Sequence, residues 1–218
     1  MTKRFPLLVF DWDGTLMDSP ALIVSSIERS CVDMGLSVPA EQDSRYIIGL
    51  GFKDSLLHLV PTLAEQDYPQ FAERYRHHFL TRDHDIPLFS GVETMLEELG
   101  SAGYFLAVAT GKSRVGLDRS LEQTGLAQHF HVTRCADESF AKPNPAMLFD
   151  VMHSLGMSAE QTLMIGDTSH DLNMARNAGV AAVAITHGAH GADELAALAP
   201  LACVDSIASL QTWLTQNG

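Results

Sequence analysis

Two carboxylates stand two residues apart where an apolar run of the sequence gives way to a turn. Residues 7–10 are all apolar, and Asp11 and Asp13 follow them directly, with Gly14 next. A short apolar run closed by a glycine-containing turn predicts a buried strand. Alternate residues of an extended chain point the same way, so the two charges would repel unless a cation or a proton lay between them. The pair indicates a metal site or acid–base chemistry, against the alternative of two ordinary turn residues.

Three further segments favour the chemical interpretation. Two are apolar, strand-like runs that end in a hydroxyl or a carboxylate, and the third is a lysine–proline pair between them. Ligands of open parallel α/β sheets bind at the carboxyl ends of the strands, so these residues would converge although they lie far apart in the sequence. The segments are residues 105–109 followed by Thr110 and Gly111, residues 162–165 followed by Gly166, Asp167 and Asp171, and the pair Lys142 and Pro143.

The ordered set resembles the four motifs of the haloacid dehalogenase (HAD) superfamily. The matches span residues 11–171 in the order of that family. Within the superfamily, the chain most resembles hydrolases of the phosphoglycolate phosphatase type. The four matches are Asp11-x-Asp13-Gly14-Thr15-Leu16, Thr110-Gly111, Lys142-Pro143 and Gly166-Asp167-x-x-x-Asp171.

The resemblance implies a Mg²⁺-dependent phosphatase that works through an aspartyl phosphate. Asp11 would be the nucleophile, and Asp13 would be the general acid and base that protonates the leaving oxygen and then deprotonates the attacking water. Asp11, Asp167 and the backbone carbonyl of Asp13 would hold Mg²⁺, which prefers hard oxygen ligands. Asp171 would ligate through a water molecule or orient the other ligands.

The remaining motif residues would bind the phosphoryl group or shape the loop around it. Thr110 and Lys142 would hold the nonbridging oxygens, and the Gly111 N–H would assist, because glycine permits close approach of the backbone. Gly14 and Thr15 would shape the loop after the nucleophile.

Several of these residues have a structural alternative. Asp167 and Asp171 could cap the helix that follows them, since acidic residues favour helix N-termini. Lys142 could be a solvated surface lysine, and Thr110 could satisfy its own turn. The motif set as a whole favours the functional interpretation of each.

The elements that must position these residues alternate between strand and helix over most of the chain. This alternation predicts an α/β fold, a Rossmann-like parallel sheet with helices on both faces. Strands are predicted at 104–109, 129–134, 162–165, 181–185 and 200–204, and helices at 92–102, 114–124, 144–156, 171–178, 192–201 and 206–215.

The segment before this alternation has a different character. Residues 17–86 contain helical patterns at 20–36, 53–60 and 64–82 and no convincing strand. We therefore expect a HAD-like catalytic core of residues 1–16 and 87–218, with an all-helical cap of residues 17–86 inserted after the first motif. The cap would determine substrate specificity and close the active site.

Composition limits the partners. The 218 residues carry a formal net charge of −13, from 14 Lys and Arg against 27 Asp and Glu. This charge argues against nucleic acid and against an anionic membrane surface. A small phosphorylated metabolite would have to be met by a local positive site, for which Lys142 and a bound cation are the candidates.

The cysteines and the first residues favour the cytoplasm. Cys31, Cys135 and Cys203 are scattered and odd in number, which suits a reducing compartment and gives no support for a zinc site. Residues 1–6 lack the apolar stretch of a signal peptide, and no window is long and apolar enough for a transmembrane span. Either a monomer or a homodimer is compatible with the sequence.

Two other activities stay open. A phosphosugar mutase of the β-phosphoglucomutase type would use the same aspartyl phosphate and return the phosphoryl group to a sugar. Inorganic pyrophosphatase activity is the second alternative. Dehalogenation is disfavoured, because attack on carbon would need neither the acid at Asp13 nor the metal-binding Asp167 and Asp171.

A few conspicuous residues have no predicted chemical role. His170 lies inside the fourth motif, where a solvated loop position is expected. Gly49 and Gly51 are expected to form a loop that faces the active site, since no dinucleotide fingerprint surrounds them. Trp12 is expected to pack in the core, on the side away from the two carboxylates.

Overall fold

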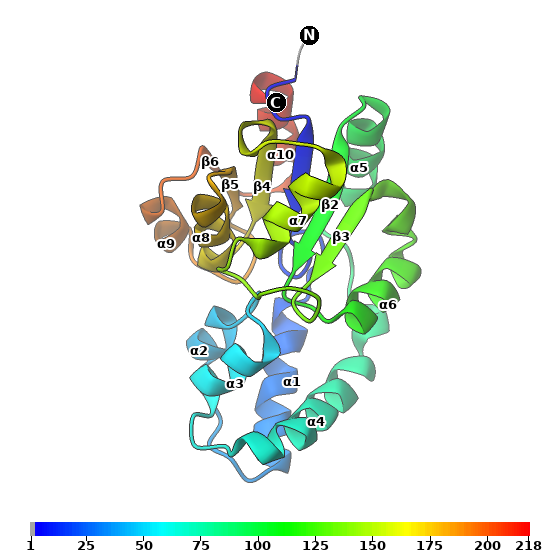
Figure 1. The fold of residues 1–218 in the computed structure, drawn as a ribbon. Coiled ribbons are helices and arrows are strands. Elements are labelled where there is room, and N and C mark those ends of the chain that lie inside the picture. Colours follow the sequence, from blue (N-terminus) through cyan, green and yellow to red (C-terminus); the bar gives the residue numbers. More distant parts are fainter. Residues whose placement is uncertain (1–2) are drawn as a thin grey trace.

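The computed structural model describes residues 3–218. The first two residues of the predicted core, and the start of the segment inspected for a signal peptide, therefore lie outside the described residues. Six parallel strands form one sheet in the order β3-β2-β1-β4-β5-β6 (Figure 1). The strands are β1 (Leu7–Phe10), β2 (Phe105–Thr110), β3 (Val132–Cys135), β4 (Thr162–Gly166), β5 (Ala181–Ile185) and β6 (Ala202–Val204).

Helices cover both faces of the sheet because successive strand residues point to opposite sides. Leu8 and Phe10 of β1 pack with α5 (Val92–Ser101), α6 (Arg114–Thr124) and α10 (Ile207–Asn217). Leu7 and Val9 face the other way, toward α7 (Ala146–Leu155) and α8 (Ser169–Ala178). The central strands are buried on both faces, which confirms the predicted α/β fold class.

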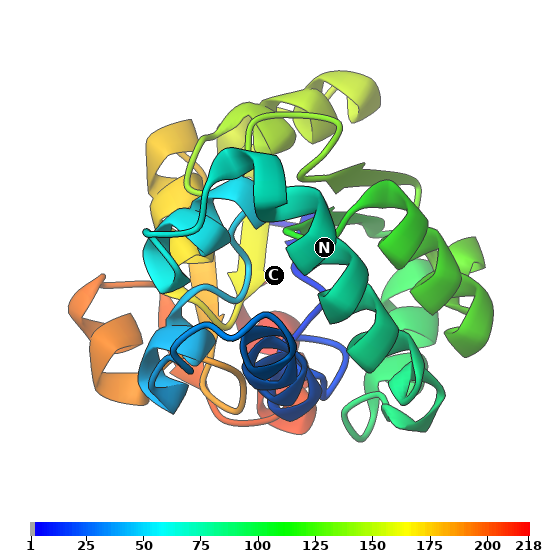
Figure 2. The same cartoon turned by 90° about the horizontal axis from the view of Figure 1, so that it is seen from below.

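Between β1 and α5 the chain forms a separate layer of helices beside the carboxyl ends of the strands (Figures 1 and 2). We call residues 17–86 the helical segment. Its own apolar cluster includes Ile27, Ile48 and Phe71. Its helices are α1 (Pro20–Asp33), α2 (Glu41–Tyr46), α3 (Phe52–Leu59) and α4 (Tyr68–Leu80), with the short 3-10 helices η1 (Glu65–Asp67) and η2 (Asp83–Asp85).

Most predicted elements are present, with shifts at their ends. Helix α6 and strand β5 have the predicted bounds, whereas α7 begins at Ala146, two residues later than predicted, and Asn144 Oδ1 accepts a hydrogen bond from Ala146 N. The predicted strand at 129–134 starts later, because Leu126–His129 forms a 3-10 helix, η3. Helix α2 was not predicted, and α9 (Ala192–Ala197) is shorter than expected. Among residues 3–218, no helix has both the length and the apolarity needed to cross a bilayer.

Candidate active site

The predicted site residues meet where the three central strands end. Strands β2 and β4 flank β1, so the residues that follow them lie side by side. The backbone N–H of Asp11 donates to the carbonyl of Ile165, 2.9 Å away, which extends the pairing of β1 with β4 by one residue. Thr110, Asp11 and Asp167 thus stand in a row at one edge of the sheet, although up to 156 positions separate them in sequence.

Asp11, Asp167 and Asp171 form a buried acidic group. One carboxylate oxygen of each lies within 4.8 Å of the others, and all three side chains are fully buried. Oδ2 of Asp11 has no hydrogen-bond partner among the described residues. Carboxylates crowded in this way need a cation between them, and carboxylate oxygens are the donors that Mg²⁺ prefers. This set of oxygen donors therefore fits Mg²⁺. The Asp171 carboxylate belongs to the group as fully as the carboxylates of Asp11 and Asp167.

Lys142 supplies a positive charge inside this group. Its ammonium lies 2.6 Å from Oδ1 of Asp11 and 2.6 Å from Oδ1 of Asp171, and it is fully buried. The alternative of a solvated surface lysine is therefore wrong. Burial alone would lower the pKa of Lys142, but the charges of Asp11 and Asp171 raise it above its usual value. The ammonium stays charged at neutral pH.

The carboxylates hold their protons more tightly than usual. Burial raises the pKa of Asp11 to about 7, although the Lys142 ammonium opposes this shift and Asp171 adds to it. Burial, with the charges of Asp11 and Asp171, also raises the pKa of Asp167 well above its ordinary value. Both shifts arise first from burial, and a divalent cation held by these carboxylates would lower both pKa values.

Asp167 is held by two short hydrogen bonds. Thr15 Oγ1 donates to Oδ1 at 2.7 Å, and the backbone N–H of Ala189 donates to Oδ2 at 2.7 Å. Thr15 thus orients a ligand of the acidic group as well as shaping its own loop. Gly14 lies so close to the Asp167 carboxylate, and at a φ of +83°, that a Cβ could not be accommodated. The contribution of Ala189 was missed, because it comes from a loop without any recognisable motif.

Asp171 has a double role. Its Oδ2 accepts from the backbone N–H of Thr168 at 3.1 Å and from Thr168 Oγ1 at 2.7 Å, as part of a capping box at the start of α8. The capping alternative is therefore correct for Asp171. Its other oxygen faces Lys142. One carboxylate both starts the helix and joins the acidic group.

The Asp13 carboxylate is not part of this acidic group. Its Oδ1 accepts from Ser19 Oγ at 2.6 Å, and Lys112 Nζ lies 2.8 Å and 2.9 Å from its two oxygens. Trp12, between the two aspartates, is buried in the core, with its indole N–H 3.3 Å from Met17 Sδ, as expected. The carboxylate of Asp13 is thus available for a role other than metal binding.

Thr110 and Gly111 lie beneath the helical segment. Thr110 is almost fully buried, and its hydroxyl accepts from the backbone N–H of Lys112 at 3.2 Å. A Cβ on Gly111 would lie 2.6 Å from the carbonyl oxygen of Gly49, so this glycine permits the close approach. The loop that contains Gly49 and Gly51 therefore faces the site, as expected.

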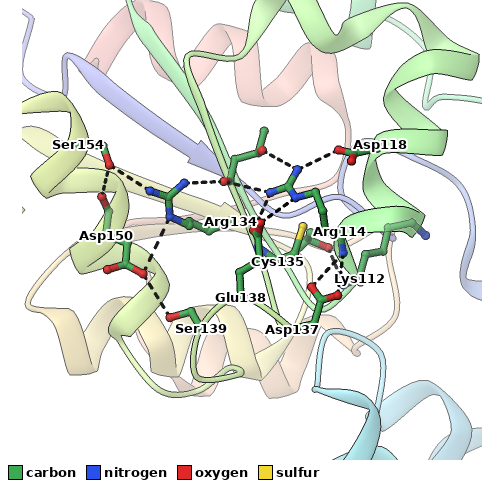
Figure 3. A network of polar contacts seen from close by, with 12 residues as sticks. Lys112, Arg114, Asp118, Arg134, Cys135, Asp137, Glu138, Ser139, Asp150 and Ser154 are labelled. Atoms are coloured by element: carbon green, nitrogen blue, oxygen red, sulfur yellow. Dashed lines mark hydrogen bonds and ion pairs between the residues drawn. The ribbon is translucent and has the colours of Figure 1, made fainter. Parts of the chain in front are cut away.

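A polar network fixes the loop that carries Lys142. Arg114 at the start of α6 pairs with Glu138 at 2.7 Å and donates to the Thr133 carbonyl at 3.2 Å (Figure 3). Asp137 accepts the backbone N–H of Arg114 at 2.9 Å. The start of α6 is thereby joined to the loop after β3, which also contains Lys142. The Arg114 side chain is 28% exposed and is held within this network.

The expectation for His170 is also wrong. His170 is buried on α8, and its Nε2 lies 2.6 Å from the backbone carbonyl oxygen of Tyr46 at the end of α2. His190 Nε2 lies 3.1 Å from the same oxygen. A carbonyl only accepts, so both rings donate to it. The two histidines join the helical segment to the residues around the acidic group, a tertiary contact that local sequence does not reveal.

The fold and this arrangement of motifs agree with comparisons to known proteins. Residues 8–185 match the family model described as "Haloacid dehalogenase-like hydrolase". The chain belongs to this family. It is 35% identical over 211 residues to the "Probable phosphatase IndB" of Dickeya dadantii, covering 94% of this chain and 91% of that protein.

Two further comparisons give a relative named as a phosphatase and a solved structure of the same fold. The chain is 31% identical over 196 residues to the phosphoglycolate phosphatase of Agrobacterium fabrum, covering 86% and 84% of the two chains. The crystal structure of a hydrolase from Pseudomonas syringae superposes with a TM-score of 0.89 over 99% of both chains, at 22% identity, and shows the shared fold. The protein is a HAD-family hydrolase of the phosphatase kind.

Proposed function

We propose that this protein is a Mg²⁺-dependent phosphatase that hydrolyses a small phosphate monoester through an aspartyl phosphate on Asp11. The observation that carries the proposal is the unpartnered Oδ2 of Asp11. This oxygen is buried at the carboxyl end of the central strand, beside Lys142 and two further carboxylates. A carboxylate oxygen free of hydrogen bonds, beside the Lys142 ammonium, suits attack on phosphorus.

Asp11 and Asp13 divide the chemistry between them. In the first step an oxygen of Asp11 bonds to phosphorus and the bond to the leaving oxygen breaks, while Asp13 gives that oxygen a proton. In the second step water attacks phosphorus, Asp13 takes its proton, and the bond to Asp11 breaks to release inorganic phosphate. The separate placement of the two carboxylates allows one to be a nucleophile while the other moves protons.

Asp11, Asp167 and Asp171 would hold the metal, with the backbone carbonyl of Asp13 as a further oxygen. Bound Mg²⁺ supplies charge neutralisation for the phosphoryl group and the carboxylates. Thr15 and Ala189 keep Asp167 in place for this role.

Lys142, Thr110 and Gly111 would bind the phosphoryl oxygens. Lys142 brings the positive charge, and Thr110 and Gly111 bring a hydroxyl and an N–H from the end of the neighbouring strand. The lysine also keeps the nucleophile oriented, since its ammonium contacts Oδ1 and leaves Oδ2 free.

The helical segment, residues 17–86, would act as the cap domain over a core of residues 1–16 and 87–218. Its Gly49 loop lies against Gly111, and its Tyr46 contacts His170 and His190. A cover in this position would exclude water during phosphoryl transfer and open to exchange substrate and product.

The proposed substrate is a small phosphorylated metabolite of the phosphoglycolate type. The protein would work in the cytoplasm as a monomer or a homodimer. Neither nucleic acid nor a membrane is a proposed partner. The net charge of −13 and the phosphoglycolate phosphatase relative support this assignment. A phosphosugar mutase of the β-phosphoglucomutase type and an inorganic pyrophosphatase are the competing outcomes.

A substrate screen tests the proposal. Phosphate release from 2-phosphoglycolate, glycerol phosphates, sugar phosphates and pyrophosphate is measured with Mg²⁺ and with EDTA. We expect release from a monoester that EDTA abolishes and that Asp11→Asn lacks, with its fold checked by circular dichroism. Asp13→Asn should be nearly as inactive on alkyl phosphates. Retained activity of Asp11→Asn, or full activity in EDTA, contradicts the mechanism, and isomer conversion of a sugar phosphate indicates the mutase.

A further inference from the structure

Lys112 is a cation beside the site that the proposed mechanism leaves unused. It follows Gly111 in the loop after β2, and its ammonium lies 2.8 Å and 2.9 Å from the two oxygens of Asp13. Only 10% of each side chain is exposed. A lysine that contacts both oxygens of the acid–base candidate in so enclosed a place is unlike a solvated surface lysine.

The contacts fix the plane of the Asp13 carboxylate. The last torsion of an aspartate is broad, so the carboxylate would otherwise rotate freely about it. Ser19 Oγ holds Oδ1 at 2.6 Å, and the Lys112 ammonium bridges Oδ1 and Oδ2. These three charge-assisted hydrogen bonds reach the Asp13 carboxylate from two directions, so they hold it in one orientation.

Lys112 is itself held at both ends. Its backbone N–H donates to Thr110 Oγ1 at 3.2 Å, and its carbonyl accepts from Ala136 N at 3.1 Å. Its ammonium lies 4.9 Å from the centre of the Phe79 ring on α4. The lysine is therefore anchored in the core loop and covered by the helical segment, so its head has little freedom to leave Asp13.

We propose that Lys112 is a positioning residue that holds the Asp13 carboxylate in line for proton transfer to the leaving group. This inference rests on the proposed role of Asp13 as acid and base. Lys112 touches no reacting atom, and it acts through the orientation of Asp13. Phe79 extends the control to the helical segment, because the ring covers the ammonium only when α4 lies over the site.

The role predicts a dependence on the leaving group. An alkyl phosphate releases a strongly basic alkoxide and needs a well-placed proton, whereas 4-nitrophenyl phosphate releases a stable phenolate and needs little help. Lys112→Met keeps most of the side-chain volume and removes the charge. We expect it to lower kcat for glycerol 2-phosphate about a hundredfold and kcat for 4-nitrophenyl phosphate by less than about fivefold.

Two further variants distinguish positioning from a general loss. Lys112→Arg, which keeps a cation, should recover much of kcat for glycerol 2-phosphate. Lys53→Met removes an exposed lysine of the helical segment that pairs with Glu65, and it should behave like the wild type on both substrates. Equal losses of Lys112→Met on the alkyl and aryl phosphates would overturn the proposal. A rise of KM confined to 2-phosphoglycolate would also overturn it, since Lys112 would then bind the substrate's carboxylate.

A crystal structure of Lys112→Met provides a test that does not depend on turnover. The Asp13 carboxylate should rotate away from its present plane while Asp11, Lys142 and Asp167 stay in place. An unmoved Asp13 overturns the proposal, whatever the kinetics show. Full activity of Asp11→Asn would instead refute the aspartyl-phosphate mechanism, and the orientation of Asp13 in the crystal would still decide the role of Lys112.

Discussion

The Lys142 ammonium lies 2.6 Å from Oδ1 of Asp11, and both side chains are completely buried. The lysine comes from the loop after β3 and the aspartate from the end of β1, so the pair joins two segments 131 positions apart. The same ammonium also contacts Asp171. Buried charges of one sign are costly without partners, so this single lysine compensates much of the charge of the acidic group.

Lys142→Met should therefore destabilise the metal-free protein. Removal of one partner of a buried ion pair costs about 3–5 kcal/mol, because the other charge is left uncompensated. Mg²⁺ should recover part of this loss by taking over the neutralisation of Asp11. Urea unfolding in EDTA and in Mg²⁺, with the exposed Lys53→Met as control, measures both effects. Equal stability of Lys142→Met and wild type in EDTA would contradict the charge compensation.

Proton binding should compete with Mg²⁺ in the acidic group. Burial raises the pKa of Asp11 to about 7, whereas the pKa of an aspartate in the unfolded chain is about 3.9. Between these values the folded state binds more protons than the unfolded state, so this group's effect is to lower the stability of the metal-free fold as pH rises toward 7. Mg²⁺ binds the charged form, so its stabilising effect should grow over the same range.

Thermal unfolding from about pH 5.5 to about pH 8, in EDTA and in Mg²⁺, measures this competition. The gap between the two midpoints should widen as pH rises. Titration of groups remote from the site changes both unfolding midpoints equally, so their effect cancels in the difference between the midpoints. In Asp11→Asn the gap should be smaller and should vary less with pH. A gap of constant size in the wild type would show that Asp11 does not couple proton and metal binding.

The core of the site was predictable from sequence because its residues follow strands. Apolar runs identify β1, β2 and β4, and a parallel sheet brings the residues after them to one edge. Asp11, Thr110 and Asp167 needed no further information. Lys142 follows no strand directly, so only its place in the motif set indicated a role in the site, and its burial beside Asp11 and Asp171 was not predicted.

The residues that were missed depend on tertiary contacts. Lys112 and Ser19 matter because both reach Asp13, and nothing in the local sequence announces such a partner. Helix α2 has six largely polar residues, too few to display a helical period of apolar positions. His170 was expected in solvent because its partner, the Tyr46 carbonyl, belongs to the helical segment 124 positions away.

His190→Ala should loosen the contact between the helical segment and the core. The variant removes one of two N–H donors to the Tyr46 carbonyl, and the ring that stacks on Tyr46 at a centroid distance of 5.7 Å. We expect faster amide hydrogen exchange in residues 41–60, with exchange in β1 and β4 unchanged.

His58→Ala is the matched control for this prediction. His58 contacts the same Tyr46 ring, at 4.8 Å between centroids, but it belongs to α3 within the helical segment. It should leave the attachment to the core intact and affect only local exchange around α3. If the two variants give the same exchange pattern, the histidine contact with the Tyr46 carbonyl does not hold the segment in place.

Gly111→Ala should separate the helical segment from the phosphate-binding loop. A Cβ at this position would lie 2.6 Å from the carbonyl oxygen of Gly49 and 2.9 Å from that of Leu50. These are backbone atoms, so the clash cannot be relieved by a side-chain rotation and the Gly49 loop must move away. An active site that closes less completely admits water and binds the phosphoryl group less well, so kcat/KM should fall by about tenfold or more.

Gly100→Ala is the control for this prediction. Gly100 lies in α5, and nothing is within 4 Å of the new Cβ, so the variant should keep full activity and gain about 0.5–1 kcal/mol in stability. Steady-state kinetics of both variants test this prediction. A fully active Gly111→Ala enzyme would show that close approach of the Gly49 loop is not required for turnover.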